Sequence, residues 1–404
     1  MNPVSPHQFS IFRMALGVYL FIHFASLIPY GPEMFSSEGL IPDGSWNPTS
    51  KIFPNILIFY DAPMFTQMFL VVLTILSGLL IIGWKRPWVS ILLWYGWACM
   101  FNRNIFTGNP GLAFLGWALL ALVVIPTGEP LAKGCEKDPD WTFPKEIFYG
   151  AWVLMALGYT LSGIHKLGSP SWVDGSALSH VLANPLARNN PLCTWMITQP
   201  ILLKMLTWGA LGLEIGFAPL ALFPKLRPWV WLAMVGMHLG ILGVIDFADL
   251  TIGVLMFHLF TFDARWIPAR THFKHQVPIL FFDGVCGFCN GFIDFLLQED
   301  KHRIYQFSPL QGDAAKQFLD EAHRSQLDNL ALWDNKVTLI KSSAVLKCLS
   351  DIGGLWGLSR IFYLVPSSLR DFVYDLIARN RYHYFGKRGT CRFPTPEERT
   401  RFLQ

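Results

Sequence analysis

Long apolar runs follow one another through the first two thirds of the chain. A helix needs about 20 mostly apolar residues to cross the hydrocarbon core of a bilayer. The runs that fit this pattern, and that we expect to be transmembrane helices, are 8–29, 64–83, 88–106, 110–127, 147–166, 203–224, 227–246 and 248–264. The pattern therefore predicts an all-α polytopic membrane bundle of about eight transmembrane helices.

A different pattern begins after about residue 270, where short apolar strands alternate with helices. The expected strands are 277–282, 304–310, 330–333 and 337–340, and the expected helices are 289–298, 312–323 and 342–350, with a helical tail at 355–380. Strands that alternate with helices indicate a small α/β domain. We therefore expect two domains, a membrane domain at 1–270 and an α/β domain at 271–404.

Composition and charge add the setting. Of the 404 residues, 52% are hydrophobic and 15% are charged, whereas an ordinary globular domain has about 25% charged residues. The net charge of +4 is small and dispersed, which argues against a nucleic-acid partner. Lys and Arg are more frequent in the loops on the same side of the membrane as the N-terminus than in the loops on the opposite side. This bias predicts an inner (cytoplasmic) membrane protein with both termini in the cytoplasm and the lipid bilayer as a partner.

A pair of cysteines opens the expected α/β domain. Cys286-Gly-Phe-Cys289 follows an apolar strand directly and begins a helix. The positive end of the helix dipole favours a thiolate, and the spacer lets the second thiol resolve a mixed disulfide. A zinc site would need two more ligands, and Cys348 and Cys391 are single and far apart, so we expect no metal. Two inert buried cysteines are a further alternative, and redox use is favoured.

Two stretches around these cysteines carry a family resemblance. FFDGVCGFCNGFIDFLLQED, with Asp283, Cys286 and Cys289, and the ending RDFVYDLIARNRYHYFGKRGTC resemble the DCC family of thiol-disulfide oxidoreductases, which are thioredoxin-like. The resemblance covers about 277–391 and implies that Cys286 attacks a thiol or disulfide partner, that Cys289 resolves the product, and that Asp283 accepts a proton. Asp283 could equally cap the helix or close the turn before it.

Ionisable and polar side chains interrupt several of the apolar runs. Such residues are costly in lipid and usually face a cavity or one another. Those that we consider as cofactor-binding candidates are Arg13, Asn102, Arg103, Glu214 and His238, to which His165 and Trp172 are added below. Arg13 with Glu214 could instead be a structural ion pair.

The segment SGIHKLGSPSWVDG, at the end of the fifth apolar run, carries a second resemblance. It resembles the part of vitamin K-dependent γ-carboxylases in which Lys-Lys-Leu precedes Asp, Trp, Val and Gly. Lys166 matches the second lysine, His165 stands in place of the first, and Trp172 matches the tryptophan. The span 8–264 is similar to the wider horizontally transferred transmembrane family that includes these carboxylases. A lysine at a helix end also commonly extends to the membrane interface for structural reasons.

The second resemblance implies a role for Lys166 as a catalytic base. A lysine must be neutral to take a proton, which desolvation beside Trp172 and the neighbouring His165 would favour. Its substrate would be a reduced quinone of the vitamin K or menaquinol type. The sequence thus predicts an integral membrane redox enzyme that combines a γ-carboxylase-like helical domain with a thiol-disulfide oxidoreductase domain. The alternative is a non-catalytic scaffold, or a lipid- or quinone-binding anchor, for a cytoplasmic thiol oxidoreductase.

Overall fold

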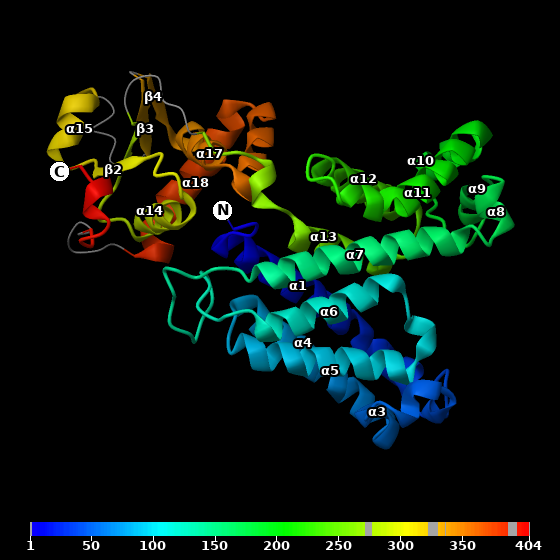
Figure 1. The fold of residues 1–404 in the computed structure, drawn as a ribbon. Coiled ribbons are helices and arrows are strands. Elements are labelled where there is room, and N and C mark those ends of the chain that lie inside the picture. The colour runs from blue at the N-terminus through cyan, green and yellow to red at the C-terminus, as the bar shows by residue number, and fades with distance from the viewer. Residues whose placement is uncertain (1, 271–276, 322–329, 336, 387–393, 404) are drawn as a thin grey trace. The chain divides into compact units, whose positions relative to one another are not determined.

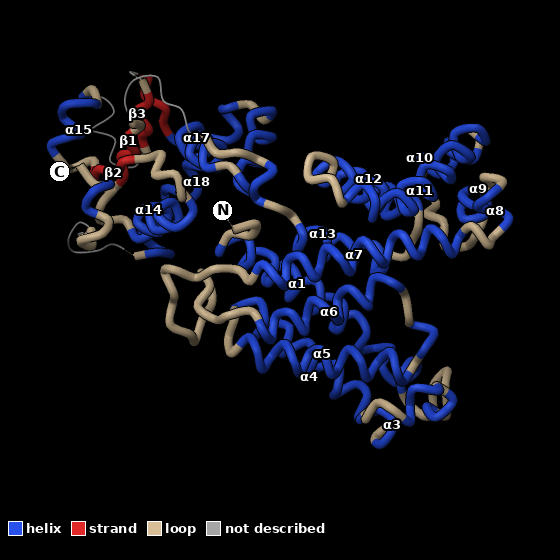
Figure 2. The backbone as a smooth tube through the Cα atoms, viewed as in Figure 1, coloured by secondary structure: helices blue, strands red, loops and turns tan. Residues whose placement is uncertain are grey.

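The computed structural model describes residues 2–270, 277–321, 330–335, 337–386 and 394–403. The chain forms two compact units, His7–Phe262 and a second unit made of Met1–Pro6 together with Asp263–Gln404. Figure 1 shows the helical unit and the smaller unit that contains the strands, and Figure 2 marks their helices and strands.

A helix lies at each of the eight apolar runs in the helical unit. They are α1 (Pro6–Leu27), α4 (Pro63–Ile82), α5 (Arg86–Arg103), α6 (Pro110–Val124), α7 (Lys145–Lys166), α11 (Pro200–Ala221), α12 (Arg227–Val244) and α13 (Ala248–Thr261). Most begin with a proline in the first turn, where its missing N–H costs nothing. Between them lie shorter elements: η1 (Ile28–Tyr30), α2 (Gly31–Phe35), η2 (Gly44–Trp46), η3 (Pro48–Lys51), α3 (Ile56–Phe59), η4 (Ile105–Thr107), α8 (Pro170–Val173), α9 (Ala177–Leu182) and α10 (Pro191–Ile197).

Five helices of the described residues are long and apolar enough to cross a membrane. They are Pro6–Phe35, in which α1 continues through η1 and α2, and then α4, α7, α11 and α12. α6 and α13 are apolar but shorter, and α5 contains Arg86 and Arg103, which lower its mean hydropathy. The expected count of about eight transmembrane helices is therefore not confirmed, although every expected segment is helical.

α7 shows how these helices divide their surfaces. Val153, Leu157, Leu161 and Ile164, which share one face of α7 at helical spacing, are all exposed. The opposite face packs on α11, and the two backbones approach closely at Gly163. A Cβ at Gly163 would lie 2.8 Å from the backbone nitrogen of Ile215. An apolar stripe without protein cover is compatible with contact to lipid.

The second unit contains a four-stranded mixed sheet with the strand order β2-β1-β3-β4. The strands are β1 (Ile279–Phe282), β2 (Gln306–Pro309), β3 (Ala331–Asp334) and β4 (Val337–Ile340). β1 is parallel to β2 and antiparallel to β3, and β3 and β4 form a hairpin. The helical elements are η5 (Ala264–Trp266), α14 (Gly287–Glu299), α15 (Asp313–Phe318), α17 (Lys341–Ile352), η6 (Gly354–Leu364), α18 (Ser367–Phe385) and η7 (Arg399–Arg401).

β1 is buried on both faces, which explains its unbroken run of apolar residues. Leu280 and Phe282 pack on one side with Cys286 and Cys289. Ile279 and Phe281 point to the opposite face of the strand and pack there against α15. The strand thus leads directly into the cysteine pair and holds it against a packed core.

Two expected helices are shorter than the pattern suggests. The tail at 355–380 is not one helix, because η6 ends at Leu364 and α18 begins only after Pro366. Proline disfavours helical backbone in the residue before it, which accounts for the break. α15 ends at Phe318, since Leu319 is extended, and the end of the expected helix at 312–323 lies outside the described residues.

Candidate functional site

Cys286 caps the N-terminus of α14. Its Sγ accepts the backbone N–H of Cys289 at 3.4 Å, as the capping side chain of a helix does. The carbonyl of Cys286 accepts a second bond from the Asn290 side chain at 2.7 Å, which fixes this turn. Both cysteines are free thiols and both are buried. The helix N-terminus therefore supplies an N–H donor and a positive dipole end to the Cys286 sulfur.

The end of α18 covers this turn. Gly287 N–H donates to the carbonyl of Gly386 at 3.2 Å, and the Phe288 and Phe385 rings lie 4.9 Å apart. A Cβ at Gly287 would lie 2.2 Å from the carbonyl oxygen of Phe385, so a glycine is required at this close approach. Cys286 beside this contact is 0% exposed, so its sulfur is not open to a partner in this structure.

Cys289 differs from Cys286 in its electrostatic setting. Burial, followed by the neighbouring Cys286, raises the pKa of the Cys289 thiol to about 12. Burial also raises the pKa of Cys348, which lies in the same core. In the reduced pair Cys289 is thus held as a neutral thiol near pH 7, which suits a group that reacts second.

Asp283 is buried and has several donors. Its carboxylate accepts from Arg381 at 3.1 Å, from the Gln311 side chain at 3.2 Å and from the backbone N–H of Val285 at 3.2 Å. Tyr382 donates a further, short bond to it. The bond from the Val285 N–H is the contact expected if Asp283 closes the turn before α14. The role of Asp283 as a proton acceptor stays a prediction.

A buried strand that leads into a dithiol at a helix N-terminus defines a thiol-disulfide redox domain. The comparisons agree, because residues 280–387 match the DCC1-like thiol-disulfide oxidoreductase family. Through this C-terminal part the chain belongs to that family.

Two relatives match about a third of the chain each. The uncharacterized protein YuxK of Bacillus subtilis is 35% identical over 134 residues, which is 32% of this chain and 98% of that protein. A chloroplastic DCC family protein of Arabidopsis thaliana is 34% identical over 131 residues, which is 31% of this chain and 76% of that protein. No solved structure matches the chain significantly.

In the helical unit, Lys166 is paired with Glu214. The Lys166 Nζ lies 2.5 and 2.6 Å from the two carboxylate oxygens, and 4.6 Å from the centre of the Trp172 ring. This is the geometry of an ammonium group between a carboxylate and an aromatic face. His165 is exposed at the end of α7. Glu214 does not pair with Arg13, so the structure does not show the ion pair that was the alternative interpretation of these two residues.

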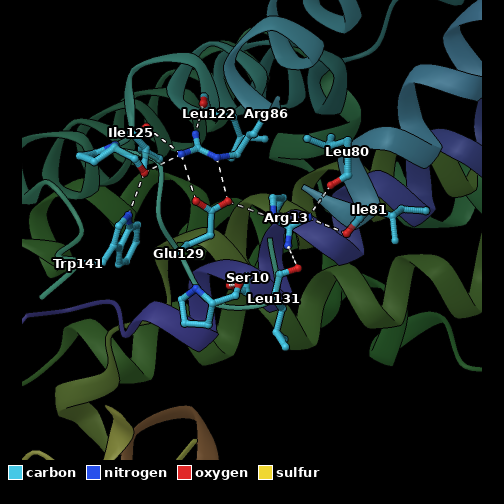
Figure 3. A network of polar contacts seen from close by, with 12 residues as sticks. Ser10, Arg13, Leu80, Ile81, Arg86, Leu122, Ile125, Glu129, Leu131 and Trp141 are labelled. Atoms are coloured by element: carbon cyan, nitrogen blue, oxygen red, sulfur yellow. Dashed lines mark hydrogen bonds and ion pairs between the residues drawn. The ribbon is translucent and has the colours of Figure 1, made fainter. Parts of the chain in front are cut away.

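Arg13 belongs instead to a separate buried network (Figure 3). The carboxylate of Glu129 lies 3.0 Å from the Arg86 Nε and 3.4 Å from the Arg13 Nε. Arg13 also donates to the carbonyls of Leu80 and Ile81 at 2.6 Å. Arg13 thus connects α1 to the end of α4 and to the loop that carries Glu129. In this structure the Arg13 side chain therefore serves to hold these segments together.

Asn102 and Arg103 lie in another place, at the end of α5. Asn102 bonds with Asn55 at 3.0 Å, and Arg103 donates to the carbonyl of Ile41 at 2.8 Å. The Nη2 of Arg103 lies 4.0 Å from Asp61. These contacts tie α5 to the loop before α4, so the expected cofactor-binding residues are not gathered in one site.

His238 is part of a buried cluster with Tyr159 and His258. The Tyr159 hydroxyl lies 2.9 Å from the His238 Nε2 and 2.8 Å from the His258 Nε2. A phenol has one proton, so it donates to one ring and accepts from the other. The Nδ1 atoms of both rings are buried and have no hydrogen-bond partner among the residues that the structure describes. Thr160, which follows Tyr159 on α7, donates to the carbonyl of Glu214 at 3.2 Å, so this cluster neighbours the ion pair.

Sequence reasoning missed Tyr159, His258 and Glu129 as site or network residues. Tyr159 and His258 lie in apolar runs, and only a three-dimensional neighbour distinguishes them from packing residues. Within the described part of the chain, no three His, Cys, Asp or Glu side chains are grouped to hold a metal. Cys391, considered above as a zinc ligand, lies outside the described residues.

Proposed function

We propose that the chain is a membrane-anchored thiol-disulfide oxidoreductase in which Cys286 and Cys289 cycle between a dithiol and a disulfide. The observation that carries the proposal is the position of Cys286 as the cap of α14, directly after the buried strand β1. The family match and the thioredoxin-like order of elements, a strand-helix-strand unit followed by a hairpin and a helix, support this activity.

We also propose that the domain with the two cysteines lies at the cytoplasmic face of the inner membrane. Labelling of Lys316→Cys by an impermeant maleimide in intact and opened cells tests this location.

The chemistry follows from the two environments. The Cys286 thiolate attacks one sulfur of a partner disulfide, forms a mixed disulfide and releases the partner's other sulfur as a thiolate. The Cys289 thiol then loses its proton to that leaving thiolate or to water and attacks the Cys286 sulfur, which breaks the mixed disulfide and releases the partner's first sulfur as a thiolate that takes up a proton from water. The products are the Cys286–Cys289 disulfide and a partner with two thiols, and the reverse sequence oxidises a partner.

Equilibration of the full-length protein in detergent with mixtures of reduced and oxidised glutathione tests this proposal. We expect the pair to interconvert between two thiols and one intramolecular disulfide, found by mass spectrometry in the single peptide that holds Cys286 and Cys289. A protein in which both thiols stay reduced at every glutathione ratio would contradict the proposal.

A second candidate function concerns the helical unit and involves the Lys166–Glu214 pair. We propose that this pair handles protons for a reduced quinone-like cofactor, as the γ-carboxylase resemblance implies. For Lys166 to act as a base, its proton must first pass to Glu214, which leaves a neutral amine and a carboxylic acid. The neutral amine of Lys166 would then be able to accept a proton from the hydroxyl of a reduced quinone held beside it. The alternative is that the pair only joins α7 to α11 within an anchor.

Lys166→Ala is expected to remove any epoxide-forming activity. Purified full-length protein would be given a reduced naphthoquinone, and oxygen uptake and quinone epoxide would be measured. We expect a loss of at least about a hundredfold, which is the usual scale for a lost acid-base group.

Lys204→Ala is the matched control for this experiment. Lys204 also lies over a tryptophan ring, that of Trp208 at 4.9 Å, but is exposed and has no carboxylate partner of this kind. Lys204→Ala should keep the activity. If Lys166→Ala retains the epoxide, or if the unsubstituted protein makes none, the anchor alternative holds.

A further inference from the structure

A cavity of about 490 Å³ lies beside the Cys289 thiol. Its walls come from α14, α17, η6 and α18, and Phe292, Leu346, Val373 and Ala378 are among the side chains that form them. The walls are almost wholly apolar. Cys289 is the only one of the cysteine pair that borders this cavity among the described residues that line it.

The lining excludes an extended peptide as the occupant. A peptide carries an N–H and a C=O on each residue, and each must find a partner when it is buried. The apolar walls offer few such partners. A molecule with a large apolar part and few polar atoms fits this surface better.

Tyr374 supplies a polar group at the cavity wall. Its hydroxyl oxygen accepts the backbone N–H of Leu330 at 2.9 Å. The hydroxyl proton has no acceptor among the described residues, so it can be donated to an oxygen of an occupant. Tyr374 and Cys289 line the same cavity. The cavity thus combines the Cys289 sulfur with the polar side chain of Tyr374, and Ser342, Arg370 and Arg381 also border it.

The cavity is continuous with an exposed apolar face. Four of its lining residues are themselves 45–55% exposed, namely Phe362, Leu369, Val373 and Ile377. Other large apolar residues of η6 and α18 are exposed beside them: Ile361, Leu364, Phe372 and Leu376. An exposed apolar patch of this kind marks a site of interaction. The unit also joins the chain directly after α13, which keeps it close to the apolar helices in sequence.

We propose that this cavity binds a lipid-soluble quinone and that the Cys286–Cys289 dithiol reduces it. The proposal rests on the redox activity proposed above and names a substrate class for the same cysteines. A quinone has a flat apolar ring, carbonyl oxygens that can accept the Tyr374 proton, and the capacity to take up two electrons. The apolar face of η6 and α18 is where such a molecule would enter from lipid.

The redox step balances without another reactant. With a quinone the order of the two cysteines is the reverse of that in disulfide exchange, because only Cys289 borders the cavity. The neutral Cys289 thiol adds its sulfur to a ring carbon while its proton goes to a quinone oxygen. The Cys286 sulfur then attacks the Cys289 sulfur and breaks the sulfur–carbon bond, whose electron pair returns to the ring. The Cys286 proton goes to the second oxygen. The dithiol loses two electrons and two protons to become the disulfide, and the quinone gains them to become the hydroquinone.

Filling the cavity tests the proposal. The reduced full-length protein in detergent would be mixed with decylubiquinone, and quinone absorbance and remaining thiols would be followed. Ala378→Trp is expected to slow quinone reduction by at least about tenfold while oxidation by glutathione disulfide stays within about twofold. Arg379→Trp, on the same helix but outside both the cavity and the apolar face, should change neither rate.

A second variant and a second oxidant make each outcome decisive. Val345→Trp fills the cavity from α17 and should act as Ala378→Trp does. Equal quinone rates in the filled and unfilled proteins would overturn the proposal, as would parallel losses of both rates in both filled variants. The quinone assignment is wrong if cumene hydroperoxide oxidises the dithiol faster than decylubiquinone does and if Ala378→Trp slows both oxidants equally. Exchange with glutathione but not with quinone overturns this inference and leaves the proposed function intact.

Discussion

Cys286→Ser is expected to abolish disulfide exchange, whereas Cys289→Ser is expected to stop it after one step. Without the Cys286 sulfur there is no nucleophile at the start of α14, and we expect the exchange rate with glutathione disulfide to fall by at least about a thousandfold. With Cys286 alone, the first attack proceeds but no second thiol resolves the product. Cys289→Ser should therefore accumulate a glutathione adduct on Cys286, detectable as an added mass on the intact protein.

Cys348→Ala is the matched control for these two variants. Cys348 is a fully buried free thiol of the same core and is not part of the pair. The substitution should keep the exchange rate while it lowers stability through lost packing. An adduct on Cys289 in Cys286→Ser would show that the roles are reversed, with the cavity-side sulfur attacking first.

Glu129→Gln is expected to lower the stability of the helical unit by about 3–5 kcal/mol, because it removes the only carboxylate that the structure shows between two buried guanidinium groups. Glu129, Arg13 and Arg86 are each at most 1% exposed. The neutral amide can still accept a hydrogen bond, so the expected loss comes from the missing charge. The thermal unfolding midpoint of the full-length protein in detergent should fall.

Glu136→Gln provides the comparison for this charge removal. Glu136 lies in the same loop between α6 and α7 but is exposed, and loss of an exposed charge usually changes stability little. Equal unfolding midpoints for the two variants would mean that the positive charges of Arg13 and Arg86 do not depend on Glu129.

The positions of the elements followed from the sequence because each depends on local pattern. Apolar runs placed helices in all eight segments, and the strand before Cys286 and the helix after it lie where alternation predicts them. The lengths of the helices were predicted less accurately than their positions. α6 and α13 are too short to meet the criterion that the other spans meet, since Pro126 and Asp263 follow soon after their ends.

The sequence did not predict which side chains pair between segments, because hydropathy indicates how deeply a residue lies in the membrane but not the direction in which its side chain points. Glu214 was considered for Arg13, yet its carboxylate meets Lys166 because α7 packs on α11 at Gly163. Glu129 stands in a loop, where a carboxylate usually faces water, and only the fold shows that it lies buried beside Arg86. Arg381 likewise reaches Asp283 across 98 residues of sequence.

The burial of Cys286 makes its reaction depend on an opening equilibrium. Cys286 is 0% exposed, so a partner disulfide can meet its sulfur only after the protein opens locally at this turn, and each turnover must wait for that opening. The exchange rate then has a ceiling set by the protein and not by the oxidant. Different partners would reach the same maximal rate and differ only in the concentration that they need to approach it.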